Sequence, residues 1–381
     1  MSVKHEKGTV HLITKPMAPP WTDSARNLPH YIIDNSPDTQ FKVITPSTAP
    51  YNAHHVTSEP VYSYEHGLQP PFSERLKLLR YLFKQFKSST KSIPDAELFH
   101  FFFTPNFLTS TSISLLKSIT RPGHTIQTVT SLPIRPSKIR HLLFSDSVVT
   151  VSKYAESIVR KQFKGHLETI YPGIPTPKAS EPEVLNQLRS KLKLEDSKIL
   201  LYPGDLYFSG CRQLLPKILC RCLKEHPEIK LLVASRAKHP KDQALRIELQ
   251  TITDRMVVLP ENEHPIFDLI SISDIVIFPV TSLYGKMDIP MVLLEAMALQ
   301  KPVVASALTS LNELGQDNAA FMCDPQQPAE FVRAICRLLE NEGYRSQLSQ
   351  NGYNLFNKQF TAKLMAEKYQ ELYRKFLEGI E

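Results

Sequence analysis

Short apolar runs rich in β-branched residues alternate with segments of helical periodicity along most of this chain of 381 residues. This alternation is typical of parallel sheets covered by crossover helices, so it predicts an α/β fold. In the first half, strands are expected at residues 10–14, 41–45, 98–103, 126–129 and 147–151, and helices at 72–90, 109–119 and 153–164. In the second half, strands are expected at residues 198–202, 230–234, 255–259, 274–278, 302–305 and 319–322. The helices of this half are expected at 211–225, 240–251, 264–271, 291–299 and 327–341, with a long last helix at 343–377.

A proline-rich segment divides the chain into two halves. Prolines at positions 172, 175 and 177 stiffen this segment and exclude a continuous helix there. The chain is long enough for each half to have a core of its own. We therefore expect one doubly wound domain over residues 1–174, a second over 175–360 and a final helix over 361–381.

Composition excludes several classes of protein. The sequence contains no apolar run long enough to span a bilayer, and its N-terminus lacks the apolar segment of a signal peptide. The five cysteines form no Cys-x-x-Cys pair, and Cys220 and Cys222 lack histidine partners, so no metal site is predicted. We interpret the cysteines as reduced thiols and expect a cytoplasmic protein.

The positive charge is unevenly distributed. The net charge is +7, but residues 1–175 carry 20 Lys and Arg against 12 Asp and Glu, so the second half is slightly acidic. This asymmetry indicates that the first half meets something anionic, such as a membrane surface, a phosphorylated acceptor or a nucleic acid. Zinc-finger spacing, aromatic RNA-binding motifs and basic tails are all missing from the sequence, so a nucleic-acid partner is not expected.

The segment 72–90 combines basic residues with apolar residues at helical spacing. It carries Arg75, Lys77, Arg80, Lys84 and Lys87 together with Leu76, Leu79, Phe83 and Phe86. A basic amphipathic helix can lie on an anionic membrane surface, which would place the protein at the inner face of a membrane. The alternative is an ordinary domain helix with a solvated basic face.

The stretch from Asp288 to Ser306 is the most informative about chemistry. It predicts a loop, a helix and then a buried strand, with the amides of Met291, Val292 and Leu293 at the helix start. The first amides of a helix lack partners and favour an anion. Glu295 follows one turn later and can accept hydrogen bonds from hydroxyls, so the pair of features suits a nucleotide sugar. The alternative is a plain helix–strand unit of a parallel sheet.

This stretch resembles the donor-binding signature of the retaining glycosyltransferases of family four. The similarity rests on residues 290–306 and extends to 273–279 and 201–206 upstream and to 315–325 downstream. The resemblance implies the GT-B fold, in which two doubly wound Rossmann-like domains face each other across a cleft. It also implies that the last helix, from residue 361 on, crosses back to the first domain. The implied activity is sugar transfer from a nucleoside-diphosphate sugar to a hydroxyl, with retention and without a metal.

The resemblance implies a role for each matched residue. Glu295 would hold the ribose of the donor and Asp288 the hydroxyls of its sugar, and these two are the candidate catalytic residues. The candidate donor-binding residues are Gly204, Arg212, Arg236, Leu259, Pro260, Met291, Val292, Leu293 and Glu295. The alternative for Asp288 is an N-cap of the helix that begins near Pro290.

Two departures from the family pattern in the second half, and a third at Ser131 in the first half, put activity in doubt. Met287 stands where the family has its first signature glutamate, and Asp288 would need a one-residue shift to replace it. Asp205 and Ser209 stand where the family has an arginine and a lysine that offset the charge of the diphosphate. Arg212 and Arg236 are the nearby cations that would substitute, with a surface arginine as the alternative for Arg212.

The first domain offers four candidates for the side of the cleft that binds the acceptor. Ser131 stands where the family usually has a histidine, and it cannot act as an imidazole would. His100 is the other family-like histidine, with a core histidine as its alternative. Asp23 and Ser24 replace a glycine pair, and they would either cap the next helix or bind sugar hydroxyls.

The sequence thus supports two hypotheses of different classes. The first is a glycosyltransferase of glycan or glycolipid synthesis, acting on a carbohydrate or glycolipid acceptor with a UDP- or GDP-linked donor and no further cofactor. The second is a GT-B-shaped binding or scaffold subunit that has lost catalysis, motivated by the departures at Asp205, Ser209, Met287 and Ser131. A third and weaker alternative is another GT-B chemistry, such as epimerisation of a sugar nucleotide.

Overall fold

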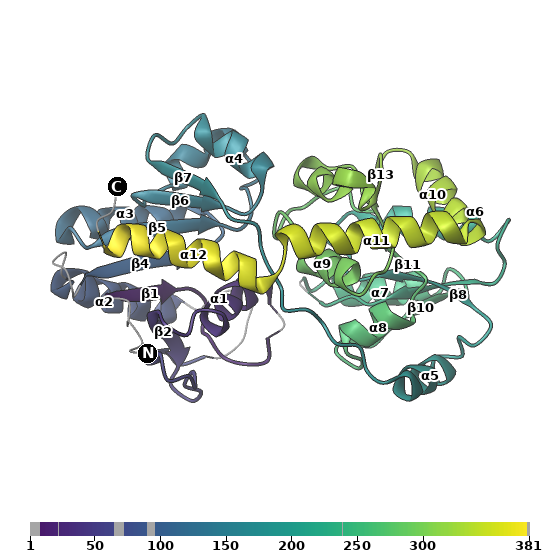
Figure 1. The fold of residues 1–381 in the computed structure, drawn as a ribbon, viewed down its shortest axis with the longest axis horizontal. Coiled ribbons are helices and arrows are strands. Elements are labelled where there is room, and N and C mark those ends of the chain that lie inside the picture. The colour runs from purple at the N-terminus through teal and green to yellow at the C-terminus, as the bar shows by residue number, and fades with distance from the viewer. Residues whose placement is uncertain (1–7, 22, 65–71, 90–95, 238, 379–381) are drawn as a thin grey trace. The chain divides into compact units, whose positions relative to one another are not determined.

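The computed structural model describes residues 8–21, 23–64, 72–89, 96–237 and 239–378. These residues form two compact units (Figure 1). Unit 1 comprises Met1–Pro175 and Ala362–Glu381, and unit 2 comprises Thr176–Thr361. The chain therefore returns to unit 1 for its last helix.

Unit 1 is built on a parallel sheet of seven strands in the order β3-β2-β1-β4-β5-β6-β7. The strands are β1 Thr9–Ile13, β2 Gln40–Pro46, β3 Val56–Tyr62, β4 Glu97–Phe102, β5 His124–Val129, β6 Ser147–Thr150 and β7 His166–Thr169. Its helices are α1 Ser24–Asp34, α2 Phe72–Ser88, α3 Phe107–Thr120, the 3₁₀ helix η1 Pro136–Leu142, α4 Lys153–Arg160 and α12 Ala362–Leu377. The sequence order of the strands reverses beside β1, so β1 and β4 form the switch point of a doubly wound sheet.

The central strand β4 shows how helices cover both faces of this sheet. Phe99 and Phe101 point to one face and join the core formed by Leu78, Leu82 and Phe86 of α2 and Ile113 of α3. His100 and Phe102 point to the other face, where their rings contact Tyr369 of α12. Because successive side chains of a strand alternate between faces, one strand serves two helix layers.

A buried polar network fastens α12 to its face of the sheet. The ring nitrogens of His100 lie 2.7 Å from the Tyr373 hydroxyl and 2.7 Å from Thr128 Oγ1. Thr128 Oγ1 in turn lies 3.1 Å from the hydroxyl of Tyr369. Full burial lowers the pKa of His100 well below its usual value, so the ring is neutral and shares hydrogen bonds rather than charge.

Unit 2 is built on a second parallel sheet, with six strands in the order β10-β9-β8-β11-β12-β13. The strands are β8 Lys198–Tyr202, β9 Ile229–Val233, β10 Met256–Val258, β11 Ile275–Phe278, β12 Val303–Ser306 and β13 Phe321–Cys323. The α-helices are α5 Pro182–Lys191, α6 Leu214–Cys222, α7 Asp242–Gln250, α8 Ile266–Ile272, α9 Met291–Ala298, α10 Pro328–Glu340 and α11 Glu342–Gln359. Two 3₁₀ helices, η2 Cys211–Gln213 and η3 Thr309–Asn318, complete it.

The predicted α/β fold with two Rossmann-like parallel sheets is confirmed. The single last helix predicted over 343–377 is wrong, because the chain leaves the helical conformation between α11 and α12. There the amide of Ala362 donates to the carbonyl of Ile174 at 2.8 Å, instead of continuing the helical ladder. No residue ranges were predicted for β3, β7 and α5, and α1 was expected only as the helix that Asp23 and Ser24 would cap.

We predict that Tyr373→Phe destabilises the protein by about 1–3 kcal/mol, because it leaves a buried ring nitrogen of His100 without its partner. The change keeps the aromatic ring, so packing against the sheet is preserved. Chemical denaturation measures the effect. Tyr353→Phe on α11, where the ring is only half-buried, is the control and should change stability by less than about 0.5 kcal/mol. Equal effects of the two substitutions would contradict a special role of the network.

Candidate functional site

The candidate site lies at the carboxyl edge of the sheet in unit 2. Strands β8 and β11 are neighbours in this sheet, and the long segments 203–213 and 279–290 follow them directly. The carboxyl ends of parallel strands meet at one edge, so the two segments lie together there. Loops at this edge are the usual place of ligand binding in such sheets.

Two glycines allow the segment after β8 to pass close to its neighbours. A Cβ at Gly204 would lie 2.6 Å from the hydroxyl oxygen of Tyr202. Gly210 has a φ of +67°, and a Cβ there would lie 1.9 Å from Thr281 Oγ1. The amide of Thr281 also donates to the carbonyl of Ser209 at 2.8 Å, so the two segments touch through their backbones.

A buried ion pair joins the same two segments. Lys286 Nζ lies 2.6 Å from Asp205 Oδ2, and the side chains of the two residues are only 6% and 1% exposed. The other oxygen of Asp205 accepts hydrogen bonds from the amides of Phe208 and Ser209, each at 3.1 Å. Asp205 therefore shapes its own loop with one oxygen and holds the next loop with the other.

The start of α9 differs in part from the prediction. The Leu293 amide donates to the carbonyl of Pro290 at 3.0 Å, so it is already engaged. Met291 and Val292 are the first two residues of the helix, where no preceding turn supplies acceptors for their amides. The anion cradle thus reduces to these two amides, which changes the predicted role of Leu293.

Asp288 does not cap this helix. The N-cap position is held by Pro290, which makes no side-chain capping hydrogen bond. Asp288 is buried, and its carbonyl accepts from the hydroxyl of Ser310 at 2.6 Å. The helix-cap alternative for Asp288 is therefore wrong, while its predicted contact with a sugar stays a prediction.

Glu295 and Arg236 form the charged part of the site. Burial raises the pKa of Glu295 to about 7, and the positive charge of Arg236 opposes this rise. Arg236 is exposed at the carboxyl end of β9. Its neighbour Ala237 donates its amide to Glu261 Oε2 at 3.2 Å, which ties the loop after β9 to the loop after β10. The structure thus places the charge of Arg236 near Glu295, although the two are far apart in sequence.

The remaining predicted donor-binding residues differ in whether they already have hydrogen-bond partners within the protein. Arg212 donates two hydrogen bonds to Glu248 Oε1 of α7, at 3.0 and 2.8 Å. The carbonyl of Leu259 accepts from Arg246, and its amide donates to Val233 at 3.1 Å. Pro260 is exposed beyond the end of β10. Arg212 is therefore an ion-paired surface arginine, as its alternative interpretation described.

Three of the four candidates in unit 1 lie beyond strand ends. Asp23 caps α1, whose first residue is Ser24, by accepting from the Ala25 amide at 3.0 Å. It also pairs with Lys15 Nζ at 2.6 Å. Although burial opposes the shift, these partners hold the pKa of Asp23 below its usual value. Ser131, two residues beyond β5, is buried and donates to Thr104 Oγ1 at 3.3 Å.

His100 is the candidate that the structure corrects. Its side chain is fully buried in unit 1, and both ring nitrogens are hydrogen-bonded within the core. A ring with no exposed atom cannot face a cleft or bind an acceptor. The predicted place of His100 on the acceptor side is therefore wrong, and the core alternative holds.

Lys286 was not among the site residues predicted from the sequence. Two features of the sequence could have indicated its role. Asp205 is acidic where the family has a cation, and Lys286 directly precedes Met287. Only the fold shows that these opposite charges meet. In the part of the chain that the structure describes, no group of three His, Cys, Asp or Glu side chains is arranged to hold a metal ion.

The geometry suits a ligand that carries both negative charge and hydroxyl groups. Met291, Val292 and Arg236 offer donors and positive charge to an anion. Glu295 offers an acceptor whose charge depends on protonation near neutral pH. These groups come from the ends of β9 and β11, while Asp205 and Lys286 hold the loops without adding net charge.

Comparison with known families identifies the domain that carries this site. Residues 197–341 match the family model described as "Glycosyl transferases group 1". An alpha-D-kanosaminyltransferase of Streptomyces kanamyceticus is 22% identical over 190 residues, which are 49% of this chain and 48% of that protein. A putative glycosyltransferase, YtcC, of Bacillus subtilis (strain 168) is 24% identical over 234 residues, 58% of this chain and 56% of that protein. The chain thus spans about half the length of the curated relatives it matches, and the resemblance predicted from the motifs is confirmed.

Solved structures share the fold over nearly the whole chain. Anabaena HepE in complex with UDP and glucose superposes with a TM-score of 0.72 at 16% identity, over 97% of this chain and 99% of that one. Sucrose-phosphate synthase from Thermosynechococcus elongatus gives a TM-score of 0.71 at 18% identity, over 98% and 100% of the two chains. The GT-B fold is therefore confirmed.

We predict that Lys286→Met destabilises the protein by about 3–5 kcal/mol, because it leaves the buried Asp205 carboxylate without a counter-charge. Adding Asp205→Asn should restore part of this loss, because the amide oxygen still accepts from the backbone and no charge remains. Chemical denaturation of the single and double variants gives the coupling between the two positions. Lys191→Met removes an exposed pair with Glu263 of similar length, 2.8 Å, and should cost less than about 1 kcal/mol. A loss at Lys286 no larger than that at Lys191 would contradict the role of the buried pair.

Proposed function

We propose that this chain, which contains a glycosyl transferases group 1 domain within a GT-B fold, is a retaining, metal-independent glycosyltransferase. It would move a hexose or a related sugar from a nucleoside-diphosphate sugar to an acceptor hydroxyl, in glycan or glycolipid synthesis. The observation that carries the proposal is that the charge of Arg236 acts on Glu295 at the carboxyl edge of unit 2. The first two amides of α9, which also carries Glu295, complete the arrangement.

Each group has a role that follows from its chemistry. The Met291 and Val292 amides and the Arg236 guanidinium would bind the diphosphate, whose negative charge grows as the sugar departs. Glu295 would accept hydrogen bonds from the ribose hydroxyls. Asp288 would hold the sugar, which fixes the anomeric carbon for attack by the acceptor. Positioning and electrostatic stabilisation, rather than a strong protein nucleophile, would then supply the rate.

The donor is most simply a UDP- or GDP-linked sugar, with no further cofactor. UDP is the first choice, because HepE, which shares the fold, was solved with UDP and with UDP-glucose. The acceptor would be a carbohydrate or a glycolipid. No helix among the described residues is long and apolar enough to cross a membrane. A contact of the basic helix α2 with a membrane surface stays a prediction.

A second candidate function rests on a specific observation. The buried pair of Asp205 and Lys286 is neutral as a whole and occupies a loop that usually supplies cations in related transferases. With Met287 in place of a carboxylate, the chain would then be a binding or scaffold subunit that has lost transfer. Thermal shift with UDP- and GDP-linked sugars, followed by product analysis, separates the two functions. A shift with transfer supports the enzyme, and a shift without transfer or hydrolysis supports the scaffold.

We predict that UDP-glucose binds up to about tenfold more tightly at pH 8 than at pH 6. The hydroxyls of ribose donate to the ionised form of Glu295, whose pKa of about 7 leaves it mostly protonated at pH 6. The diphosphate of this donor is fully ionised over the whole range, so it adds no titration of its own. Isothermal titration calorimetry measures the affinity. Glu295→Gln should bind more weakly and without this pH dependence, while Glu371→Gln on the exposed side of α12 should behave as the wild type.

We predict that Arg236→Met weakens binding of UDP-glucose about 10- to 100-fold, as expected for the loss of hydrogen bonds from a cation to an anion. Arg212→Met is the matched control, because this arginine is already paired with Glu248, and it should change affinity by less than about twofold. The reverse order of effects would assign the diphosphate to Arg212 and contradict the site as built here.

A further inference from the structure

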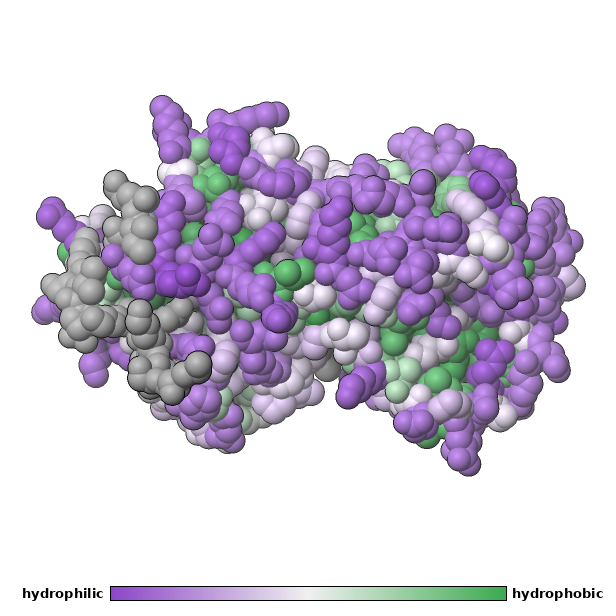
Figure 2. All heavy atoms as spheres, viewed as in Figure 1, coloured by the Kyte–Doolittle hydropathy of each residue, from purple (hydrophilic) through white to green (hydrophobic). Residues whose placement is uncertain are grey.

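The exposed aromatic side chains of unit 2 gather at the carboxyl edge of its sheet. Tyr207 and Tyr284 have 39% and 48% of their surface exposed, and no other phenylalanine or tyrosine among the described residues of this unit is exposed to that degree. Tyr207 lies in the segment after β8 and Tyr284 in the segment after β11. The outer side of α11, in contrast, is mostly hydrophilic in Figure 2. The two rings therefore share the edge that carries Arg236 and the start of α9.

Two further rings connect these tyrosines into one row. The centre of the Phe208 ring lies 5.1 Å from that of Tyr207 and 5.4 Å from that of Tyr284, with the rings edge to face in both pairs. His239, from the segment after β9, stacks on Tyr207 with a distance of 3.8 Å between ring centres and an angle of 7° between the planes. We call Tyr207, Phe208, His239 and Tyr284 the aromatic row. The row spans the ends of the three neighbouring strands β9, β8 and β11.

A buried carboxylate holds the half of the row that contains Tyr207 and His239. Asp242 is fully buried, and its two oxygens accept from the Tyr207 amide at 2.9 Å and from the His239 amide at 2.7 Å. The Lys241 amide donates to Nδ1 of His239 at 3.1 Å, which fixes the orientation of this ring. The stacked pair is therefore positioned by the backbone and does not depend on ring contacts alone.

A second buried carboxylate holds the other half of the row. Asp205 accepts from the Phe208 amide at 3.1 Å and pairs with Lys286, two residues after Tyr284. A Cβ at Gly285 would meet no atom within 4 Å, so the space beside Tyr284 is open. The row is thus anchored from below and open to a ligand. A surface that is already ordered loses less conformational freedom when it binds.

The exposed charges around the aromatic row are positive. Lys241 is exposed, and its Nζ lies 5.6 Å from the centre of the Tyr207 ring. Arg236 is exposed on the same segment. The acidic residues of the segments that carry the row, Asp205 and Asp288, are both buried. A ligand that approaches the described part of this edge would therefore meet aromatic rings and cations.

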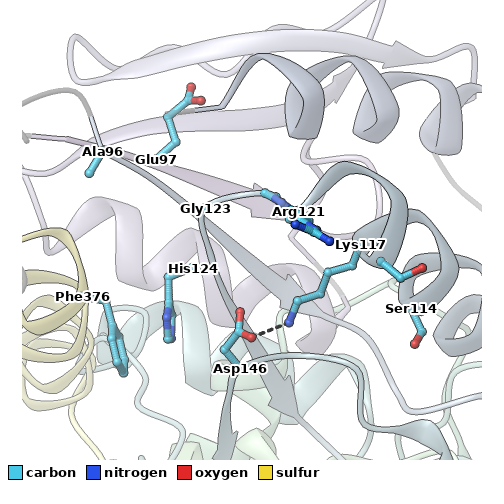
Figure 3. Close-up of a pocket in the computed structure, with 11 residues that line it drawn as sticks. Ala96, Glu97, Ser114, Lys117, Arg121, Gly123, His124, Asp146 and Phe376 are labelled. Carbon is cyan, nitrogen blue, oxygen red and sulfur yellow. Dashed lines mark hydrogen bonds and ion pairs between the residues drawn. The ribbon is translucent and has the colours of Figure 1, made fainter. Parts of the chain in front are cut away.

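A cavity in unit 1 lacks this combination. It has a volume of about 620 Å³ and lies at the amino ends of β4 and β5, as Figure 3 shows. The charged side chains that line it are Glu97 and Asp146 on one side of the balance and Lys117 and Arg121 on the other. Lys117 is already paired with Asp146 at 2.7 Å. Because these charges cancel, the cavity does not favour one class of charged ligand as the aromatic row does.

We propose that the aromatic row binds a glycan that carries carboxylate groups. The C–H faces of its sugar rings pack on the exposed sides of Tyr207 and Tyr284, and Lys241 pairs with a carboxylate. The tyrosine hydroxyls suit the mixed face of a sugar, on which C–H groups alternate with hydroxyls. Only the identification of this glycan as the acceptor rests on the proposed function, since binding to the row requires no catalysis.

Charge and ring placement favour this occupant over two others. A protein interface is usually depleted of lysine at its core, whereas Lys241 lies directly over the Tyr207 ring. A single-stranded nucleic acid would need cations along the whole path of its phosphates, and Lys241 and Arg236 are the exposed cations on the described part of the segment after β9. A chain of acidic sugars needs only occasional cations between its stacked rings.

Isothermal titration calorimetry with galacturonate oligosaccharides tests the proposal on the full chain, in the absence of donor. The wild type should bind these probes, and added salt should weaken the binding. Tyr207→Ala and Tyr284→Ala should each weaken it about tenfold, because a stacking ring is lost. Tyr207→Phe keeps the ring and should bind within about threefold of the wild type. Lys241→Gln should weaken binding about two- to fivefold, as expected for an exposed ion pair.

Matched controls separate the row from general effects of charge and hydropathy. Ile247→Ala removes an apolar side chain of α7 that is 59% exposed, and Lys217→Gln removes an exposed charge of α6. Both controls should bind galacturonate within about twofold of the wild type. All variants should keep the wild-type melting temperature because the changed residues are exposed.

A parallel titration with UDP-glucose separates this proposal from the proposed function. Its affinity should stay within about twofold of the wild type in every variant. Failure of the wild type to bind UDP-glucose while it binds galacturonate would contradict the proposed function and leave the glycan surface in place. Binding of UDP-glucose without binding of galacturonate would overturn the glycan surface alone.

Other results would also overturn the proposal. Neutral maltooligosaccharides that bind as tightly as galacturonate would contradict the role of charge. A loss of UDP-glucose affinity in Tyr207→Ala would assign this ring to the donor. Tighter binding of a single-stranded oligonucleotide would assign the row to nucleic acid. A wild-type dimer that Tyr284→Ala dissociates, detected by analytical ultracentrifugation, would assign it to a second copy of the chain.

Discussion

The buried ion pair between Asp205 and Lys286 is the interaction on which the rest of the site depends. It joins the segment after β8 to the segment after β11, and both partners are almost fully withdrawn from water. A buried charge is tolerated only with its counter-charge, so neither loop can move away from the other without a large penalty. The glycines at 204 and 210 make the close approach sterically possible. The position of the start of α9 therefore depends on the contact of Lys286, several residues earlier in the chain, with Asp205.

This pair also determines how charge is distributed at the site. Since it is neutral as a whole, it cannot offset the charge of an anionic ligand, and Arg236 is left as the cation near Glu295. Glu295 is charged above a pH of about 7, because burial raises its pKa to that value. Above this pH an anion entering the site would meet the carboxylate of Asp205 neutralised by Lys286 and the charge of Glu295 opposed by that of Arg236. The ribose hydroxyls that donate to Glu295 would offset its remaining charge.

The sequence predicted the strands and helices that hydrophobic periodicity specifies. It did not predict the features that depend on contacts between residues far apart in the chain. The strands of the second half were placed almost to the residue, because buried parallel strands are continuous apolar runs. The edge strands β3 and β7 were missed, since edge strands carry polar residues and β3 contains Pro60. The bounds of α1 were not predicted, because Pro29 lies inside it and only a helix after Asp23 and Ser24 was expected. The pairing of Asp205 with Lys286 could not be predicted, because no local rule connects residues in two different loops.

His100 is a second example of a residue whose partners cannot be predicted from its neighbours in the sequence. Its neighbours along the chain are apolar, and they give no sign that Thr128 and Tyr373 supply its hydrogen bonds. In a core, a polar group must find all its partners or destabilise the fold, so such a network accepts only one placement of the helix that completes it. The face of β4 that holds Phe99 and Phe101 does not specify one position of the helices packed on it, because apolar contacts tolerate small shifts of the side chains. The polar face of β4 therefore specifies where the last helix returns to unit 1, while its apolar face mainly contributes stability.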